Sequence, residues 1–283
     1  MPEIRAQDAF REKGGEAWAA LNEQTDAMLA PYGRAALEAL QASPGECVLD
    51  VGCGCGTTVL ELAARVAPDG RVTGVDISEP MLALARKRCA NNPQIELVLE
   101  DAALQSFAVA SFDALFSRFG VMFFADPLAA FSRLRQALRP RGRLAFVCWQ
   151  AMAANEWATV PLSAARRALP HAELPPLLNP DKPGPFFFAD PKRVEQILRS
   201  AGFGNVRIEP FEVQTSLGAA GTLTDALSYV CQIGPTARLL AEVDPNLHDA
   251  ARKALSDALA EYMTENGVQL RGAAFVVTAS NAG

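Results

Sequence analysis

Three glycines stand at alternate positions in LDVGCGCGTT, residues 49–58. Gly52, Gly54 and Gly56 lie between an apolar run, CVLDV (47–51), and a stretch whose apolar residues recur at helical spacing. Glycine has no Cβ, so the backbone there can turn sharply and approach a ligand closely. The helix that follows offers free N–H groups and the positive end of its dipole. The pattern therefore predicts a ligand-binding loop between a strand and a helix.

Two acidic residues follow the glycine loop at the ends of the next two predicted strands. Asp76 ends RVTGVD (71–76), where a carboxylate can accept hydrogen bonds from both hydroxyls of a ribose. Asp101 follows IELVLE (95–100), where a carboxylate can accept from the amino group of an adenine. Ligands of open α/β sheets bind at the carboxyl ends of the strands, where both acids stand. Loop and acids together suit a single nucleoside with a short charged tail.

A dinucleotide such as NAD is the alternative ligand, because a glycine loop followed by a ribose-binding acid also suits NAD. Two details disfavour an NAD-type oxidoreductase. The dinucleotide fingerprint is GxGxxG, and its third glycine would fall at Thr57, so this loop reads GxGxG. Asp101 adds a second acid suited to adenine. Asp50, inside the first strand, is compatible with two roles: orienting the loop through its backbone amides, or touching the ligand.

Strand and helix patterns alternate along the chain from Cys47 to Trp149. Strands apolar on both faces, separated by helices, predict a parallel sheet covered on both sides. Two further strands complete an α/β fold with seven mostly parallel strands. The expected strands are 47–51, 71–76, 95–100, 111–117, 143–149, 206–215 and 273–280, and helices are expected at 57–67, after Ser78, after Asp126 and after Asp190.

Three stretches do not fit the alternation and are expected to pack over one end of the sheet. The first is amphipathic, with a helix break at Pro31 and with Gly14-Gly15 as a hinge before Trp18. The expected organisation is an N-terminal helical lid (1–44), a core (45–149), a cap insertion (150–189), a core helix with the sixth strand (190–215), a helical cap insertion (216–267) and the seventh strand (268–283).

The composition restricts the function classes. Half of the 283 residues are hydrophobic and the formal net charge is −6, which disfavours a general nucleic-acid binder. No apolar run is long enough to cross a membrane, and the polar N-terminus has no signal-peptide core. The six cysteines show no dense disulfide pattern and fit reduced thiols. A soluble cytoplasmic protein is therefore expected, and its oligomeric state stays open.

The whole run of motifs resembles the class I S-adenosylmethionine-dependent methyltransferases, most closely the type 11 small-molecule branch related to the quinone-biosynthesis enzymes. The resemblance covers residues 45–150 well. It implies a Rossmann-like sheet with helices on both faces and an inserted helical cap, and S-adenosylmethionine as methyl donor with S-adenosylhomocysteine as product. The segments that carry it are VLDVGCGCGTT (48–58), GVDIS (74–78), EDA (100–102), FDALFSRFGVMFF (112–124) and RPRGRLAFVCW (139–149).

The resemblance also implies roles for individual residues. The glycines line the methionine moiety, Thr57 and Thr58 hydrogen-bond its carboxylate, and the backbone of Ser117 contacts its amine. Asp76 holds the ribose, while an aromatic side chain in the leading helix folds over the cofactor, where a sulfonium beside a ring is favourable. The full expected cofactor-binding set is Trp18, Gly52, Gly54, Gly56, Thr57, Thr58, Asp76, Ile77, Asp101, Ala102 and Ser117.

The sequence specifies the residues that bind the methyl acceptor less closely than those that bind the cofactor. Phe119, Met122, Trp149 and Phe188 are candidates for lining the substrate pocket, with plain core packing as the alternative. No catalytic base is assigned; His171, in the presumed cap, is the candidate. The acceptor atom stays open between oxygen, nitrogen, carbon and sulfur.

Two other readings concern the fourth strand and the cysteines. FSRFG (116–120) replaces the Asn/Asp-Pro-Pro-aromatic signature of enzymes that methylate amino groups of nucleic-acid bases, which disfavours a nucleic-acid substrate. Cys53 and Cys55 form an isolated CxC pair, interpreted as small residues in a tight turn rather than metal ligands. The expected function is methyl transfer to a small, partly apolar metabolite by in-line displacement. A protein that binds the cofactor without transferring methyl, in a pericyclic or binding role, is the alternative.

Overall fold

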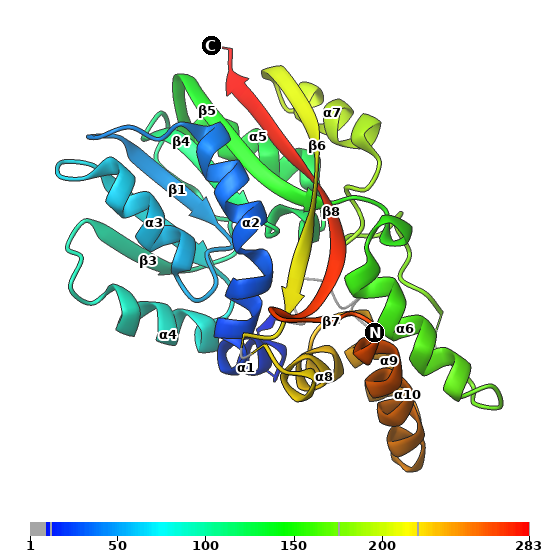
Figure 1. Ribbon diagram of the computed structural model, residues 1–283. Helices are drawn as coiled ribbons and strands as arrows, with labels where there is room; N and C mark the ends of the chain where they lie inside the picture. The colour runs from blue at the N-terminus through cyan, green and yellow to red at the C-terminus, as the bar shows by residue number, and fades with distance from the viewer. Residues whose placement is uncertain (1–9, 12, 175, 220, 283) are drawn as a thin grey trace.

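The computed structural model describes residues 10–11, 13–174, 176–219 and 221–282. Its centre is a sheet with the strand order β3-β2-β1-β4-β5-β8-β6, and β7 pairs with β8 outside this path (Figure 1). The strands are β1 Cys47–Val51, β2 Arg71–Asp76, β3 Ile95–Leu99, β4 Phe112–Arg118, β5 Leu138–Trp149, β6 Phe203–Leu217, β7 Met263–Thr264 and β8 Gly267–Asn281.

The pairing confirms the α/β class with a mostly parallel sheet. Five adjacent strands run parallel to one another, in the order β3, β2, β1, β4 and β5. Strand β8 is antiparallel to both β5 and β6. The sheet has eight strands rather than the expected seven. The extra strand, β7, is two residues long and pairs Met263 with Val268 in a hairpin, too short for a hydrophobic pattern to reveal.

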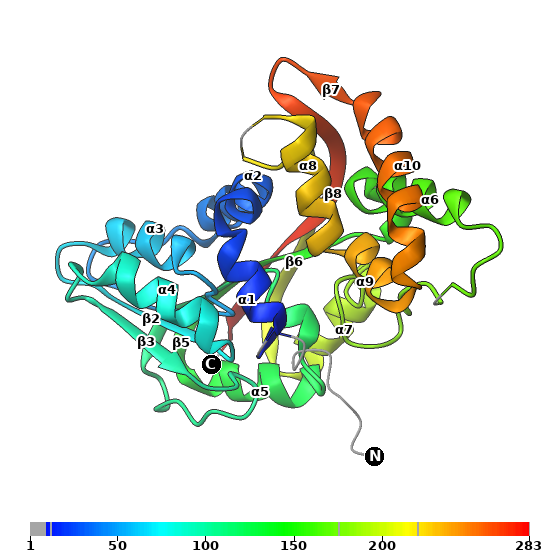
Figure 2. The ribbon, with the colours of Figure 1, turned by 90° about the horizontal axis from the view of Figure 1, so that it is seen from below.

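Helices cover both faces of the sheet. Figure 2 shows α2 (Asn22–Leu40), α3 (Thr57–Val66) and α4 (Glu79–Cys89) on one side, and α5 (Pro127–Ala137) and α7 (Pro191–Ser200) on the other. Asp-Pro pairs begin the last two helices as expected. The Asp126 carboxylate accepts from the Ala129 N–H at 3.0 Å, and Asp190 accepts from the Lys192 N–H at 2.9 Å.

The leading helical segment differs from the expectation. The break lies at Leu21, between α1 (Lys13–Ala20) and α2, and Pro31 sits inside a continuous α2. A proline removes one helical hydrogen bond, but α2 packs along β4, β5, β6 and β8 on both sides of Pro31, and this burial holds the helix together. Gly14 and Gly15 lie in the first turn of α1 rather than in a hinge before it.

A group of helices stands where β6 and β8 extend beyond the rest of the sheet (Figure 1). Helix α6 packs against α9 and α10, and α8 packs against α9, α10 and the two long strands. The group consists of α6 (Glu156–Ala168), α8 (Leu223–Gln232), α9 (Pro235–Glu242) and α10 (His248–Ala260), with 3₁₀ turns η3 (Met152–Ala154) and η4 (Pro245–Leu247) beside α6 and α10. A further 3₁₀ turn, η2 (Val121–Phe123), follows β4 and lies beside β5. No helix of the described residues is long and apolar enough to cross a membrane.

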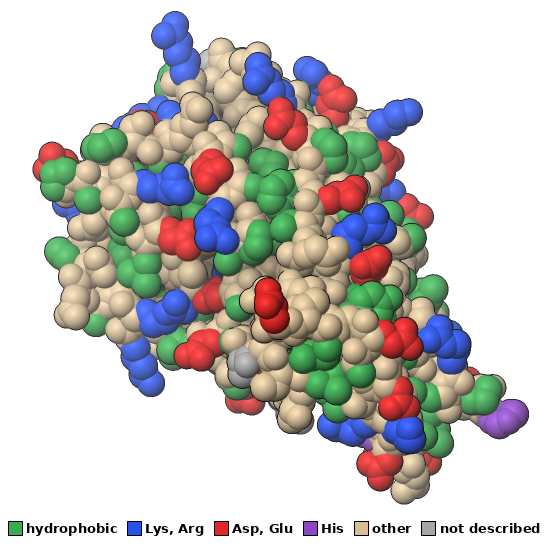
Figure 3. All heavy atoms as spheres, viewed as in Figure 1, with side chains coloured by type: hydrophobic (Ala, Val, Ile, Leu, Met, Phe, Trp, Pro, Cys, Tyr) green, Lys and Arg blue, Asp and Glu red, His purple; other side chains and the backbone are tan. Residues whose placement is uncertain are grey.

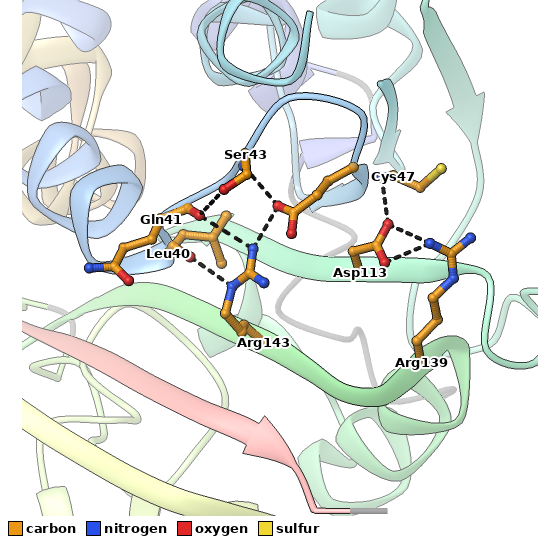
Figure 4. Close-up of polar contacts among 8 residues, drawn as sticks. Leu40, Gln41, Ser43, Cys47, Asp113, Arg139 and Arg143 are labelled. Carbon is orange, nitrogen blue, oxygen red and sulfur yellow. Dashed lines mark hydrogen bonds and ion pairs between the residues drawn. The ribbon is translucent and has the colours of Figure 1, made fainter. Parts of the chain in front are cut away.

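Two arginines fasten the amino ends of the strands (Figure 4). Arg143 Nε donates to the Leu40 carbonyl at the end of α2 at 3.0 Å, and its Nη2 lies 2.6 Å from Glu46 Oε2. Arg139 Nη1 lies 2.6 Å from both carboxylate oxygens of Asp113. Strand β5 begins at Leu138, ahead of the expected start at residue 143. These ion pairs and hydrogen bonds stabilise the edge of the sheet where the amino ends of the parallel strands lie. The functional site lies at the opposite edge.

Candidate functional site

A pocket opens at the carboxyl ends of the parallel strands, under α1 and the first turns of α2. Counting its open mouth it encloses about 1000 Å³, the upper end of the range for small-molecule sites. Its walls come from the loops after four strands and from the N-terminal helices: Val51–Cys55, Val75–Ile77, Glu100–Ala102, Arg118–Gly120 with Phe123–Phe124, and side chains of α1 and α2. The glycine loop and both predicted acids therefore face one cavity.

The glycine loop turns through left-handed backbone conformations. Gly54 has φ +53°, and a Cβ built on it would meet Met81 Sδ at 3.8 Å, so its pocket side is open. Gly56 has φ +84°, and its Cβ would lie 3.0 Å from the Ala85 Cβ. Gly56 therefore allows α4 to pack closely against the start of α3 and is not part of the pocket wall.

Asp76 holds the loop as well as facing the cavity. Its two oxygens accept from the Gly54 N–H at 2.8 Å and the Ser78 N–H at 2.9 Å. Burial raises the pKa of Asp76, and these backbone donors oppose the rise. Asp101 lies in the same cavity, 8% exposed, with its Oδ1 accepting from the Ala103 N–H at 3.0 Å.

The two threonines after the loop have other partners than those expected. The Thr57 hydroxyl donates to Asp26 of α2, and the Thr58 hydroxyl donates to Asp50 of β1. Asp50 is fully buried, and its other oxygen has no hydrogen-bond partner among the described residues. Burial, first of all, raises the pKa of Asp50 to about 7. Thr58 lines the cavity and Thr57 does not.

A charge network that sequence reasoning missed crosses the pocket wall. Arg118 Nη2 lies 2.6 Å from Asp26 Oδ1, and Arg88 Nη1 lies 3.4 Å from Asp26 Oδ2 and 3.2 Å from the Cys55 carbonyl. Asp26 and Arg118 both line the cavity. The available signal was an arginine at the carboxyl end of a buried strand, directly after Ser117.

Aromatic rings form a further part of the wall. The Phe10 ring lies 5.6 Å from the Trp18 ring and 4.9 Å from the Phe123 ring, both edge-on. Phe119 stacks on Trp149 with centroids 4.1 Å apart and an interplanar angle of 18°. Trp149 therefore supports Phe119 from behind rather than lining the cavity.

The predicted site residues fall into two groups. The cavity is lined by Trp18, Gly52, Gly54, Thr58, Asp76, Ile77, Asp101, Ala102 and Phe119. Outside the cavity wall are Gly56, Thr57, Ser117, Met122, Trp149, Phe188 and His171.

Several of the second group have structural contacts instead. The Ser117 hydroxyl donates to the Val51 carbonyl at 2.7 Å, joining the ends of β1 and β4. Phe188 is fully buried beside the rings of Phe131 and Phe146. His171 is exposed beyond α6. No group of three or more His, Cys, Asp or Glu that could hold a metal occurs among the described residues.

Comparison with known proteins adds to this geometry. Residues 48–142 match a family model described as a methyltransferase domain, a range that includes the glycine loop and both pocket acids. Over this range the chain is similar to methyltransferase domains. The matched range runs from β1 to the start of β5, and the cap and N-terminal helices lie outside it.

Two curated relatives and one solved structure illustrate the methyltransferase match. Nocamycin O-methyltransferase of Saccharothrix syringae is 33% identical over 186 residues, covering 62% of this chain and 66% of that protein. Demethylmenaquinone methyltransferase of Symbiobacterium thermophilum is 40% identical over 111 residues, covering 38% and 43%. The chain thus spans less than two thirds of either relative. Phosphoethanolamine N-methyltransferase 2 of Haemonchus contortus, solved with S-adenosyl-L-methionine, shares the fold at a TM-score of 0.59 and 18% identity, covering 100% of this chain and 61% of that one.

Proposed function

We propose that this protein transfers a methyl group from S-adenosylmethionine to a small, partly apolar molecule. The observation that carries the proposal is one cavity lined by Asp76 and Asp101, by Arg118 and by a set of aromatic rings. We assign the two acids to the nucleoside end of the cofactor and Arg118 to its polar tail, while the rings offer apolar surface for an acceptor.

The nucleoside end fits adenosine in two respects. Asp76 keeps acceptor capacity for ribose hydroxyls, because a carboxylate has about four lone-pair sites and the backbone N–H groups of Gly54 and Ser78 occupy only part of them. Ile77 and Ala102 would supply apolar surface for the base, and Asp101 would supply an acceptor for its amino group. Asp76 would therefore hold the sugar while Asp101 reads the base.

The tail end fits an α-amino acid, with roles that differ from the sequence expectation. Thr57 and Thr58 already donate to Asp26 and Asp50, so a carboxylate would instead meet Arg118 and the free N–H groups near the loop. The Asp26 carboxylate would accept from the ammonium group. One cation and one anion side by side match the two charges of a zwitterion.

The bound cofactor would supply a methyl group that its sulfonium already activates. The protein's part is then to orient the acceptor in line with the sulfur–methyl bond and to exclude water. The rings of Trp18, Phe10 and Phe123 can do the second, because they cover the cavity as a connected cluster. A base is needed where the acceptor must lose a proton before attack, and no residue is assigned to that step.

A small acceptor is supported by the relatives and by the surface. The relatives' names specify nocamycin and demethylmenaquinone, both small molecules. On the face shown in Figure 3, basic and acidic side chains are interspersed, whereas nucleic-acid binding proteins gather basic residues on one face. The cytoplasm is the proposed compartment, because all six cysteines are free thiols.

Two measurements test the proposal. Titration calorimetry with S-adenosylhomocysteine should show binding, and incubation with methyl-labelled S-adenosylmethionine and a panel of small phenols, carboxylic acids, amines and thiols should label at least one of them. If S-adenosylhomocysteine does not bind, the proposal is wrong. Binding with no labelled product across the panel would instead support the alternative role without methyl transfer.

A further inference from the structure

One residue of the pocket wall, Thr25, carries a hydroxyl group that the fold leaves unpaired. Thr25 of α2 is 5% exposed, and its hydroxyl has no hydrogen-bond partner among the described residues. Its backbone N–H donates normally to the Leu21 carbonyl at 2.9 Å. Buried polar groups in folded proteins are nearly always paired, because burial without a partner costs free energy. An unpaired hydroxyl beside a cavity therefore suggests a partner that is a ligand.

The contacts of Thr25 differ from those of its neighbour Asp26. Asn22, Thr25, Asp26 and Leu29 recur at helical spacing and all line the cavity from α2. Asp26 faces Arg118 and the glycine loop. Thr25 instead lies beside the Tyr229 phenol of α8, without the geometry of a hydrogen bond. Since α8 belongs to the cap helices, Thr25 marks where the cavity meets the cap.

The surroundings of Thr25 in the cavity are largely apolar. Leu29 lies one turn further along α2, and the Phe119, Phe123 and Phe124 rings contribute from the β4 side. Phe119 is held rigidly by its stack on Trp149. A flat, largely apolar molecule with one neutral polar group suits this combination, because the rings bury its body and the hydroxyl pairs its polar atom.

We infer that Thr25 is a specificity-determining residue that hydrogen-bonds a hydroxyl or carbonyl group of a flat, partly apolar acceptor. Asn22, one turn earlier, gives the same stripe a second polar group. A threonine hydroxyl donates and accepts, and rotation about the Cα–Cβ bond exchanges the places of its oxygen and methyl group. The inference depends on the proposed function, since it assigns the cap side of the cavity to the acceptor.

A pair of probes isolates the hydroxyl. The probes are 2-naphthol and 2-methylnaphthalene, which differ by a hydroxyl in place of a methyl group, titrated by ligand-detected NMR into protein saturated with S-adenosylhomocysteine. Wild-type protein should bind 2-naphthol about fivefold more tightly, the effect of one net hydrogen bond. Thr25→Val should bring the two dissociation constants together, and Thr25→Ser should keep the preference.

A matched control removes an equally unpaired buried hydroxyl elsewhere. Thr236 of α9 is buried, its hydroxyl has no partner among the described residues, and it lies outside the cavity wall. Thr236→Val should leave the probe preference unchanged. Without ligand, Thr25→Val should melt at the wild-type temperature or above it, because an unpaired hydroxyl is replaced by a methyl group of the same shape.

The outcomes separate the two proposals. If wild-type protein binds S-adenosylhomocysteine but does not prefer 2-naphthol, or if Thr25→Val keeps the preference, the role of Thr25 is refuted while the proposed function stands. If Thr25→Val melts at a lower temperature and loses affinity for both probes equally, Thr25 has a structural role, and this result also refutes the inference. If S-adenosylhomocysteine does not bind to the wild type, the proposed function itself fails.

Discussion

Arg118, the last residue of β4, pairs with Asp26 in the first turns of α2, with Nη2 2.6 Å from Oδ1. Their side chains are 13% and 21% exposed, so water screens the pair less than it screens a surface ion pair. The pair joins the core sheet to the N-terminal helices inside the pocket. It also places one positive and one negative group at the proposed tail end of the cofactor.

The first prediction concerns this tail end. Arg118→Met should weaken S-adenosylhomocysteine binding by about 10- to 100-fold, since a charge-assisted hydrogen bond contributes about 1.5–3 kcal/mol. Binding of 5′-methylthioadenosine, which lacks the amino-acid tail, should change little. Calorimetry of both ligands measures the difference, with Glu79→Gln as control because its ion pair with Arg86 lies on the surface. An equal loss for both ligands would contradict a role toward the tail.

The second prediction concerns the ribose end. Asp76→Ala should weaken S-adenosylhomocysteine binding by about 1–3 kcal/mol, because ribose hydroxyls would lose their acceptor. Asp76 also accepts from the Gly54 N–H, so the substitution loosens the loop. Asp76→Asn keeps one acceptor oxygen and should fall between wild type and Asp76→Ala. Wild-type affinity in Asp76→Ala, measured by calorimetry, would remove Asp76 from the site.

The third prediction uses the buried carboxyl of Asp50. Its pKa is raised from 3.8 in the unfolded chain to about 7 in the folded one, so the folded state binds the proton more tightly. As the pH rises between those two values, the unfolded state releases the proton while the folded state keeps it. The free energy of unfolding therefore falls as the pH rises. Below pH 4 the carboxyl is neutral in both states, and this contribution to the pH dependence vanishes.

Asp50→Asn removes the titrating carboxyl group, so a comparison with wild type measures what this group contributes to the pH dependence of stability. The free energy of unfolding of the variant relative to wild type should rise by about 2–4 kcal/mol between pH 4 and pH 8. Urea unfolding at several pH values measures the difference, since all other titrating groups are shared. A constant difference across this range would mean that Asp50 is ionised in the folded protein.

The fourth prediction concerns the helix over the pocket. A Cβ on Gly15 of α1 would lie 2.2 Å from the Ser78 Oγ and 2.3 Å from the Phe10 carbonyl. Gly15→Ala should therefore push α1 away from α4, displace Trp18 and weaken S-adenosylhomocysteine binding about three- to tenfold, as loss of part of an aromatic contact would. Glu16→Ala, at an exposed position of the same helix, is the control. Unchanged affinity would show that α1 does not cover the ligand.

Local patterns carried much of the fold. The bounds 47–51 and 71–76 of the first two strands agree with the structure, because apolar runs between turn signals are local features. The helix break was misplaced, since Pro31 is accommodated by packing against the sheet, which no local pattern encodes. The same limit hid β7, whose two residues exist as a strand through pairing with β8.

The amino-acid sequence by itself determined the glycine loop, its two acids and their order along a parallel sheet. These follow from residue type and spacing within short segments, and the structure brings Gly54, Asp76 and Asp101 to one cavity. The tertiary structure alone decided which distant side chains join them. Asp26 and Arg118 are 92 residues apart, and Thr57 turns to Asp26 because α2 lies across the sheet at that point. Such partners depend on helix packing, which acts over long sequence separations and leaves no periodic signal.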